Sequence, residues 1–391
     1  MLVHLVKIHA PDFDLATTLD SGQVFHWEKI GNGFVGAVGD SPVCVEQGRN
    51  VLKVRCGGTP QPTRQRRALP RIIAHYFALD HPLAEICASF PNDPAMSAAR
   101  HFCHGLRIIR QPKWECLATF ICSSMKQVAH IRQISKALRE RFGAARKIDH
   151  QVVHTFPSVQ RLAESSESEL RKCALGYRAK NLLATARLVS SGEADLDAWS
   201  ALSDTDLREK LCALPGVGAK IANCVMLFAY ERLRAFPIDV WIERVLREKY
   251  FPGNGKTTTQ RLREFSETYF GDHGGYAQQY LFHYARTALR KSGAPIPQER
   301  NPPLHSGRKD KGKDARTALR KSGTPRDSST PLGMTKRRDA RTALRKIGFP
   351  AYRARRQARC PPAESGWKPN FLYIRAPATF GSQVVRACRL R

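Results

Sequence analysis

Two patterns of apolar and polar residues divide the chain. Up to about residue 60, short segments rich in Val and Ile alternate with Gly, Asn, Asp and Pro, as is typical of short β-strands joined by turns. The segments are LVHLVKI (2–8), GFVGAVG (33–39), PVCVEQ (42–47) and VLKVRC (51–56). They predict a small antiparallel sheet.

From about residue 67 to 291 the apolar residues recur every three or four positions, which is the spacing of amphipathic helices. The clearest ranges are 71–79, 115–142, 158–174, 178–191, 204–214, 214–230 and 258–270. Breakers such as Gly143, Gly176, Gly192 and Pro215 separate several of them. We therefore predict an α+β fold, with an antiparallel sheet domain over 1–95 and a mainly helical domain over 96–292.

The pattern changes again after about residue 293. The stretch ARTALRKSG at 285–293 recurs at 315–323, and as ARTALRKIG at 340–348. A solenoid needs units that stack and bury a continuous core, and these copies are too short, too unevenly spaced and too basic. We predict that 293–391 is a disordered basic tail.

Charge points to the kind of partner. The formal net charge is +30, and the last 91 residues hold 23 Lys and Arg against 5 Asp and Glu. Residues 1–300 hold 41 against 29 and are also basic. Such an excess favours a polyanionic partner, with nucleic acid first and an acidic membrane second, although in the tail it can equally serve solubility.

The cysteines indicate a reducing compartment. There are eleven, none in a C-x-x-C pair, and no spacing of Cys and His is typical of a zinc site. The N-terminal residues contain no apolar secretory core, and no apolar run approaches the roughly 20 residues that span a bilayer. We expect an intracellular monomer without a membrane partner, in the cytoplasm or nucleoid of a bacterium or the nucleus of a eukaryote.

A glycine turn in LPGVGAK (214–220) carries the first chemical signal. Gly216 and Gly218 permit a tight turn between two helical segments, and the turn presents a helix N-terminus, whose N–H groups suit a phosphate. A helix, a short glycine hairpin and a second helix grip the DNA backbone without reading sequence. The amides of Gly216, Val217 and Gly218 are therefore candidate DNA contacts.

Lys220 lies in the first turn of the following helix, with Cys224 four residues later on the same face. A solvated or phosphate-binding lysine is the simpler interpretation. The alternative is a nucleophile, because a helix N-terminus and apolar walls disfavour the charged amine. A neutral amine can attack a sugar carbon and persist as a Schiff base.

Asp239, in FPIDV (236–240), comes directly before another helical segment. An aspartate at such a position most often caps the helix. A carboxylate held there near Lys220 can also stabilise positive charge that develops on a sugar ring. The two roles are compatible.

Together, LPGVGAK and FPIDV resemble the helix-hairpin-helix, Gly/Pro-rich loop, aspartate superfamily of DNA glycosylases. The rest of the chain is similar to the 8-oxoguanine DNA glycosylase family over roughly residues 5–290. The motifs, in family order, are LDSGQVFHW (19–27), GLRIIRQPKWECLATFICSS (105–124), LGYRAKNL (175–182) and YAQQYLF (276–282).

This resemblance assigns roles to single residues. It implies that Lys220 and Asp239 are catalytic and that Cys224 packs against the damaged base. It implies that the Gly22 carbonyl accepts the N7 hydrogen that distinguishes 8-oxoguanine from guanine. Gln278 would read the Watson–Crick edge and Phe282 would stack on the base, and their spacing of four places them on one helical face.

The resemblance extends to contacts with the opposite strand. Tyr177 and Arg178 match a pair that wedges into the base stack and contacts the opposite cytosine. Without the resemblance, Tyr177 and Arg178 fit equally well a tyrosine that packs at the start of a helix and an arginine that is solvated. Taken alone, Phe282 would more often be a core residue and Gln278 a surface residue.

The chain departs from the family after ICSS (121–124). Met125, Lys126, Gln127 and His130 stand where the family often has asparagines and an arginine. We expect them to contact DNA, but preference for an opposite cytosine is open. Trp241 stands where the family can have a histidine. No cysteine run for an iron–sulfur cluster is present, and we expect no cofactor. The family allows an optional cation at the carbonyls of Cys212, Leu214 and Val217.

We predict a bifunctional glycosylase and lyase that excises 8-oxoguanine from damaged double-stranded DNA in base excision repair. Two alternatives remain: a glycosylase of the same fold that acts on alkylated or other damaged bases, and a non-catalytic helix-hairpin-helix DNA-binding protein.

Overall fold

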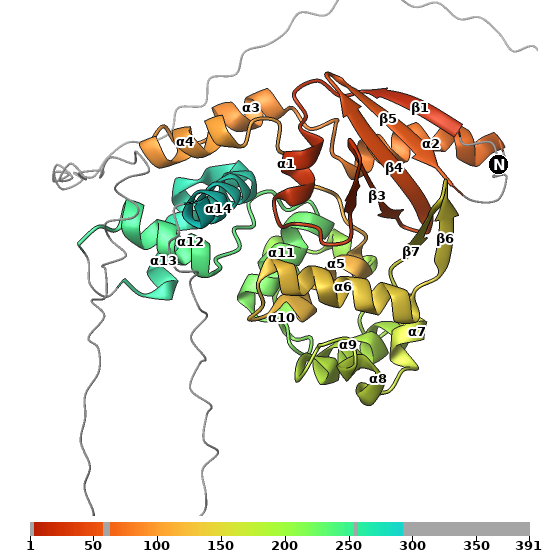
Figure 1. The fold of residues 1–391 in the computed structure, drawn as a ribbon. Helices are drawn as coiled ribbons and strands as arrows, with labels where there is room; N and C mark the ends of the chain where they lie inside the picture. The colour runs from red at the N-terminus through yellow and green to blue at the C-terminus, as the bar shows by residue number, and fades with distance from the viewer. Residues whose placement is uncertain (1–3, 58–62, 254–256, 292–391) are drawn as a thin grey trace, which may run out of the picture. The chain divides into compact units, whose positions relative to one another are not determined.

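An antiparallel sheet forms the N-terminal part of the fold (Figure 1). The structure is a computed structural model, and it describes residues 4–57, 63–253 and 257–291. Its strands are β1 (His4–His9), β2 (Glu28–Ile30), β3 (Gly33–Val38), β4 (Ser41–Gly48) and β5 (Val51–Cys56). The strand order is β1-β5-β4-β3-β2, and every neighbouring pair is antiparallel. The predicted N-terminal sheet is confirmed.

A layer of apolar side chains covers one face of this sheet. Val43, Val45, Leu52 and Val54 are fully buried in a cluster that also contains Phe77. The aromatic members contact one another: Trp27 donates a hydrogen bond from Nε1 to the Tyr76 hydroxyl at 3.0 Å. The sheet thus has a small core of its own.

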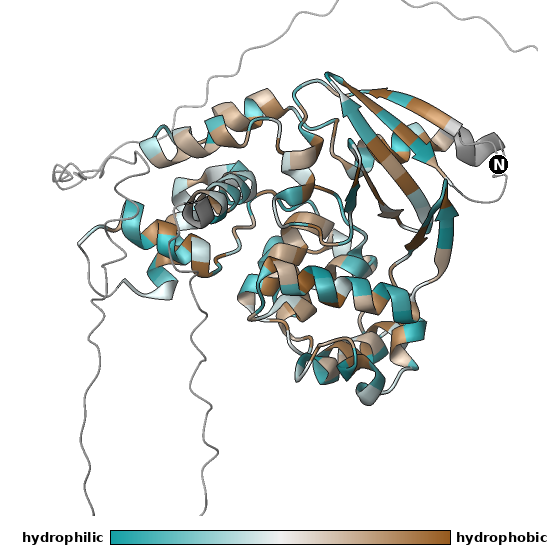
Figure 2. Cartoon of the chain, in the orientation of Figure 1, coloured by the Kyte–Doolittle hydropathy of each residue, from teal (hydrophilic) through white to brown (hydrophobic). Residues whose placement is uncertain are grey.

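Helices make up most of the remaining chain. They are α1 (Leu15–Asp20), α2 (Thr63–Tyr76), α3 (Leu83–Ala88), α4 (Pro94–Phe102), α5 (Lys113–Ser123), α6 (Val128–Phe142), α7 (Val159–Ala163), α8 (Glu167–Arg171), α9 (Arg178–Ser190), α10 (Asp204–Cys212), α11 (Ala219–Ala229), α12 (Val240–Val245), α13 (Thr259–Tyr269) and α14 (Gly274–Lys291). Short turns of other helix types are η1 (Ala198–Ala201), η2 (Leu246–Tyr250) and η3 (Gly271–His273). Figure 2 shows apolar and polar residues alternating along α6, and the apolar ones join a second, larger core.

Three features within the predicted helical part differ from the sequence-based prediction, the first being that the range 158–174 divides into the two short helices α7 and α8. Residues 145–154 form a hairpin of β6 (Ala145–Ile148) and β7 (Gln151–His154), whose Ile148 and Val153 pack against Val35 and Cys44 of the sheet. The range 115–142 is also not one helix. It breaks between α5 and α6, where Met125 takes a positive φ of 55°, so a turn replaces the predicted continuous helix.

All described residues fall into one compact unit, and the predicted boundary at 95/96 stays a prediction. The predicted disordered tail and the second and third repeat copies lie outside the described residues. No described helix combines the length and the apolar composition needed to cross a membrane.

A buried ion pair links α5 to α6. The Glu115 carboxylate accepts a hydrogen bond from the Arg139 guanidinium, and both side chains are less than a tenth exposed. His26 lies 3.4 Å from the same carboxylate. Burial, with help from the Arg139 charge, holds the pKa of His26 well below its usual value, so the imidazole is neutral near pH 7. Arg139 therefore supplies the positive charge that compensates Glu115.

Replacing Arg139 with Met should lower the free energy of unfolding by about 3–5 kcal/mol, because it leaves a buried carboxylate without its cation. Chemical denaturation at pH 7 would measure this. Lys136→Met is the matched control on the same helix: Lys136 pairs with Glu28 at 3.0 Å in solvent, and its loss should cost less than about 1 kcal/mol. Equal losses would contradict the assigned role of the buried pair.

Candidate active site

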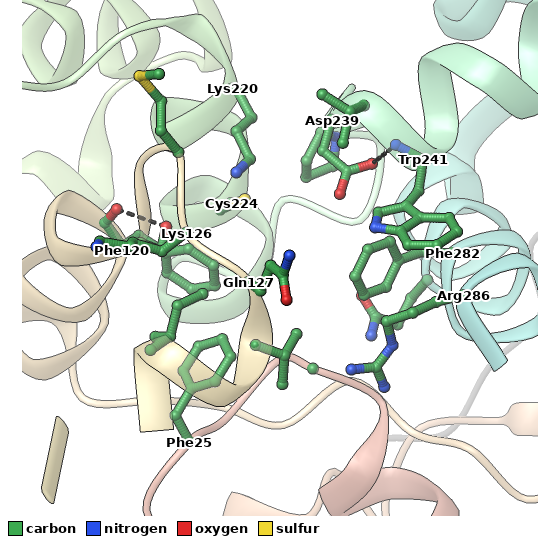
Figure 3. A pocket seen from close by; sticks show the side chains of 18 of the residues that line it. Phe25, Phe120, Lys126, Gln127, Lys220, Cys224, Asp239, Trp241, Phe282 and Arg286 are labelled. Atoms are coloured by element: carbon green, nitrogen blue, oxygen red, sulfur yellow. Dashed lines mark hydrogen bonds between the residues drawn. The ribbon is translucent and has the colours of Figure 1, made fainter. Parts of the chain in front are cut away.

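A cavity of about 410 Å³ lies between α5–α6, α11, α12, α14 and the segment after α1 (Figure 3). It brings together predicted site residues from distant parts of the chain. Those that line it are Gly22, Met125, Lys126, Gln127, Lys220, Cys224, Asp239, Gln278 and Phe282. Tyr177, Arg178, His130 and the hairpin residues Gly216, Val217 and Gly218 are not part of its lining.

The glycine turn determines where α11 begins. Gly216 has a φ of 80°, and a Cβ atom there would lie 2.7 Å from the side-chain nitrogen Nδ2 of Asn181 on α9. Only glycine meets both demands without strain. Gly218 is the N-cap of α11, so Lys220 is its second helical residue and extends into the cavity.

The hairpin carbonyls are partly engaged within the turn. The Val217 amide donates to the Leu214 carbonyl at 3.1 Å, although a carbonyl oxygen has a second lone pair for a cation. Among the described residues, no group of three or more His, Cys, Asp or Glu side chains could hold a metal ion. The optional cation at Cys212, Leu214 and Val217 stays a prediction.

Asp239 is the N-cap of α12, as its position in the sequence indicates. Its Oδ1 accepts hydrogen bonds from the amides of Trp241 at 3.1 Å and Ile242 at 2.9 Å. These bonds fix the orientation of the carboxylate. Figure 3 shows its other oxygen directed toward the cavity that Lys220 enters from α11.

Cys224 lies one turn after Lys220 and is buried. Burial raises the pKa of its thiol to about 12, the Lys220 charge opposes this shift, and the Asp239 charge adds to it. The thiol is therefore protonated at neutral pH and is a poor nucleophile. Lys220, Cys224 and Asp239 all line the same cavity.

Gln278 and Phe282 line the cavity from α14, on which they lie one helical turn apart. Gln278 is only 4% exposed, and its Oε1 is buried without a hydrogen-bond partner among the described residues. A buried acceptor left unpaired is costly unless a ligand or water satisfies it. Its presence in the cavity lining thus points to a bound group that donates hydrogen bonds.

Gly22 closes the cavity beside Phe282. Its φ is 90°, and a Cβ atom there would lie 3.0 Å from Cε1 of the Phe282 ring. Gln23 anchors the segment, with Nε2 donating to the Arg107 carbonyl at 2.8 Å and Oε1 accepting from the Ile109 amide at 2.7 Å. Any larger residue would both strain the backbone and displace the ring.

The turn between α5 and α6 carries the residues that depart from the family pattern. Met125 lies in this turn and is 38% exposed, and the Tyr177 hydroxyl donates a hydrogen bond to its sulfur at 3.5 Å. Gln127 is the N-cap of α6 and projects into the cavity (Figure 3). His130 is exposed and is not part of the cavity lining.

Tyr177 and Arg178 differ in their surroundings. Tyr177 is 53% exposed, whereas Arg178 is 5% exposed. Arg178 donates from Nε to the Ser124 carbonyl at 2.7 Å and from Nη1 to the Leu175 carbonyl at 3.1 Å, and its guanidinium lies 4.3 Å from the centre of the Tyr177 ring. In this arrangement Arg178 holds the turn that presents Met125.

Sequence reasoning missed several residues that line the cavity. Phe120 and Phe228 stack at 5.5 Å with an angle of 10° between their rings, and Phe25 packs edge-on to Phe120. Arg286 was also missed, although a signal existed: it follows Phe282 by four positions, as Phe282 follows Gln278, so the three share a face of α14.

Comparisons with known families and structures show which proteins the chain resembles. The family model described as 8-oxoguanine DNA glycosylase, N-terminal domain, matches residues 5–117, and that of the HhH-GPD superfamily base excision DNA repair protein matches 118–269. A structure of MBOgg1 in complex with a low affinity DNA ligand is 30% identical, with a TM-score of 0.67, over 73% of this chain and 99% of that one. The chain belongs to the 8-oxoguanine DNA glycosylase family.

Other similar proteins are also named as DNA glycosylases with lyase activity. The chain is 29% identical to N-glycosylase/DNA lyase OGG1 of Arabidopsis thaliana, over 71% of this chain and 78% of that protein. A structure of the Clostridium acetobutylicum 8-oxoguanine glycosylase/lyase, with double-stranded DNA containing cytosine opposite 8-oxoG, is 28% identical with a TM-score of 0.66, over 73% and 98% of the two chains. The predicted family, fold class and enzyme class, a DNA glycosylase with lyase activity, are confirmed.

Gly22→Ala should reduce base release from a duplex carrying 8-oxoguanine opposite cytosine by about tenfold or more, because displacing a pocket wall misplaces the reacting group. Single-turnover assays would measure it. Gly39→Ala is the matched control, since Gly39 also has a positive φ but no atom within 4 Å of its Cβ position. It should lose stability and keep base release; equal losses of base release would contradict the assignment.

Proposed function

We propose that this glycosylase flips 8-oxoguanine out of duplex DNA into the cavity and removes it by attack of Lys220 on the sugar. The observation that carries the proposal is the convergence of Lys220 and Asp239 on a cavity whose lining also holds a buried acceptor, Gln278 Oε1, without a hydrogen-bond partner among the described residues. A flipped base with N–H donors on its Watson–Crick edge would satisfy that acceptor.

The pocket residues fit an oxidised guanine. Phe282 offers a flat face for stacking, and Cys224 offers a protonated thiol on the other side. The carbonyl of Gly22 accepts none of the hydrogen bonds found among the described residues. It can therefore accept the N7 hydrogen of 8-oxoguanine, whereas N7 of guanine is an acceptor and would repel it.

The chemistry proceeds in two stages. The Lys220 amine bonds to C1′ through its lone pair and loses a proton as the C1′–N9 bond breaks, and the base leaves with the bonding electrons of that bond and takes up a proton. Opening of the sugar gives a Schiff base between lysine and C1′. Loss of a C2′ proton then expels the 3′ phosphate, which cuts the strand by β-elimination, and water releases the lysine.

Asp239 would support this sequence electrostatically. Because α12 fixes one oxygen of its carboxylate, the other is pre-positioned for the positive charge that develops on the sugar. The carboxylate can also help to orient the amine of Lys220.

DNA would lie across the cavity mouth. The hairpin amides at Gly216, Val217 and Gly218 suit backbone phosphates, and Lys126 can hold a phosphate near the lesion. Met125 and Tyr177 are exposed and suited to fill the gap that the flipped base leaves. Arg178 supports them through the Ser124 carbonyl.

A glycosylase of the same fold for alkylated bases is the rival within enzymes. Gly22 favours 8-oxoguanine, because an alkylated purine does not need a hydrogen-bond acceptor at N7. Lys220 argues against a glycosylase that uses only water as its nucleophile. Incubation with a panel of duplexes, each carrying one lesion, separates the two.

Borohydride reduction during reaction with an 8-oxoguanine duplex should trap a covalent adduct with the unsubstituted protein and none with Lys220→Gln. Lys126 lines the same cavity and provides the matched control: Lys126→Gln should still form the adduct at saturating duplex. Gel mobility and peptide mapping identify the attached lysine. An undiminished adduct with Lys220→Gln would refute the mechanism, and no adduct with any form would favour a non-catalytic binding protein.

Asp239→Asn should lower base release by about 100-fold, yet keep the free energy of unfolding within about 0.5 kcal/mol, because asparagine is also a good N-cap. Asp239→Ala should lose the same activity and about 1 kcal/mol of stability. Parallel kinetics and denaturation would check this. Activity that follows stability across the two variants would show that Asp239 acts as a cap alone.

A further inference from the structure

Arg286 adds a positive charge to the end of the cavity that is distant from Lys220 (Figure 3). It comes from the same face of α14 as Gln278 and Phe282. Its guanidinium carbon lies 5.4 Å from the centre of the Phe282 ring, within the range of a cation–π contact. The position of this charge is therefore coupled to the ring on which a base would stack.

Arg286 is also held against the segment that contains Gly22. Its Nη2 donates to the Asp20 carbonyl, and its Nη1 lies 3.6 Å from the position of a Cβ on Gly22. A guanidinium presents five N–H groups in a planar fork. It can thus hold the Asp20 carbonyl and contact a base beside Gly22 at the same time.

The chemistry of the purine edge identifies the atom within reach. If the Gly22 carbonyl accepts the N7 hydrogen, the oxygens on either side of it are O6 and O8. O8 lies on the side nearer the sugar, where Lys220 attacks, and O6 lies on the side away from it. Arg286 is at the end of the cavity opposite Lys220, which favours O6.

We infer that Arg286 is a specificity-determining residue that donates a hydrogen bond to O6 of the flipped base, an inference that rests on the proposed function. Gly22 and Arg286 then form a matched acceptor and donor for the N7 hydrogen and O6. Adenine-derived lesions such as 8-oxoadenine carry an amino group at C6, which would place a donor against the donor of Arg286. Gly22 selects the oxidised base, and Arg286 selects guanine over adenine.

The test measures binding without chemistry, in the Lys220→Gln background of the full chain. Three duplexes are compared: one with 8-oxoguanine, one with 8-oxoadenine, and one with a tetrahydrofuran abasic site. Arg286→Leu should weaken binding of the 8-oxoguanine duplex about 10- to 100-fold, as expected for a lost hydrogen bond from a charged group. Binding of the other two duplexes should change by less than about threefold.

Two further variants separate recognition from packing. Arg286→Lys keeps a charged donor over Phe282 and should recover part of the affinity for 8-oxoguanine alone. Arg187→Leu is the control, because Arg187 also donates to a backbone carbonyl, that of Ala163, on the surface. It should leave all three affinities unchanged.

Each remaining outcome overturns the inference. Equal weakening of the two oxidised purines would mean that Arg286 only supports the Gly22 segment, and no weakening would mean that it contacts no base. Failure of the proposed function is seen separately, as absence of 8-oxoguanine release by the unsubstituted protein. If that protein releases 8-oxoguanine while Arg286→Leu fails to discriminate, only the inference about Arg286 is wrong.

Discussion

The contact between α14 and the segment after α1 is the constraint on which the cavity depends. Gln279 donates to the Ser21 carbonyl at 3.0 Å across 258 positions of sequence, and Arg286 donates to the neighbouring Asp20 carbonyl. Gly22 then lies directly against the Phe282 ring. The N-terminal part of the fold therefore contributes directly to the site, because Gly22, in the segment after α1, lines the cavity.

The opposite side of the cavity depends on two helix N-termini. The glycine turn determines where α11 begins and so where Lys220 emerges, and Asp239 begins α12 through two hydrogen bonds to backbone amides. Helix ends are rigid points from which to aim a side chain, since capping bonds satisfy amides that the helix leaves unpaired. In the proposed mechanism, the carboxylate of Asp239 both caps α12 and acts in catalysis.

The elements with strong local signals were predictable. The strands β1, β3, β4 and β5 and most helices followed from the spacing of apolar residues, and the glycine turn followed from its glycines, whereas the three-residue strand β2 was missed. The β6–β7 hairpin was missed because it is short and is held by side chains of a distant sheet. The break at Met125 was missed because nothing in its residue type favours a positive φ; Arg178 stabilises the turn from another helix.

The sequence by itself determined the family and the fold class and predicted one shared site for Lys220 and Asp239, because these depend on local motifs whose order along the chain is preserved. Only the tertiary structure decided which residues share the cavity. In the tertiary structure Arg178 is buried against the Tyr177 ring, and His130 is not part of the cavity lining. Arg286 lies beside Gly22. The reason is physical: burial and contact depend on segments that lie far apart in sequence, and local periodicity carries no information about which distant backbone a side chain will meet.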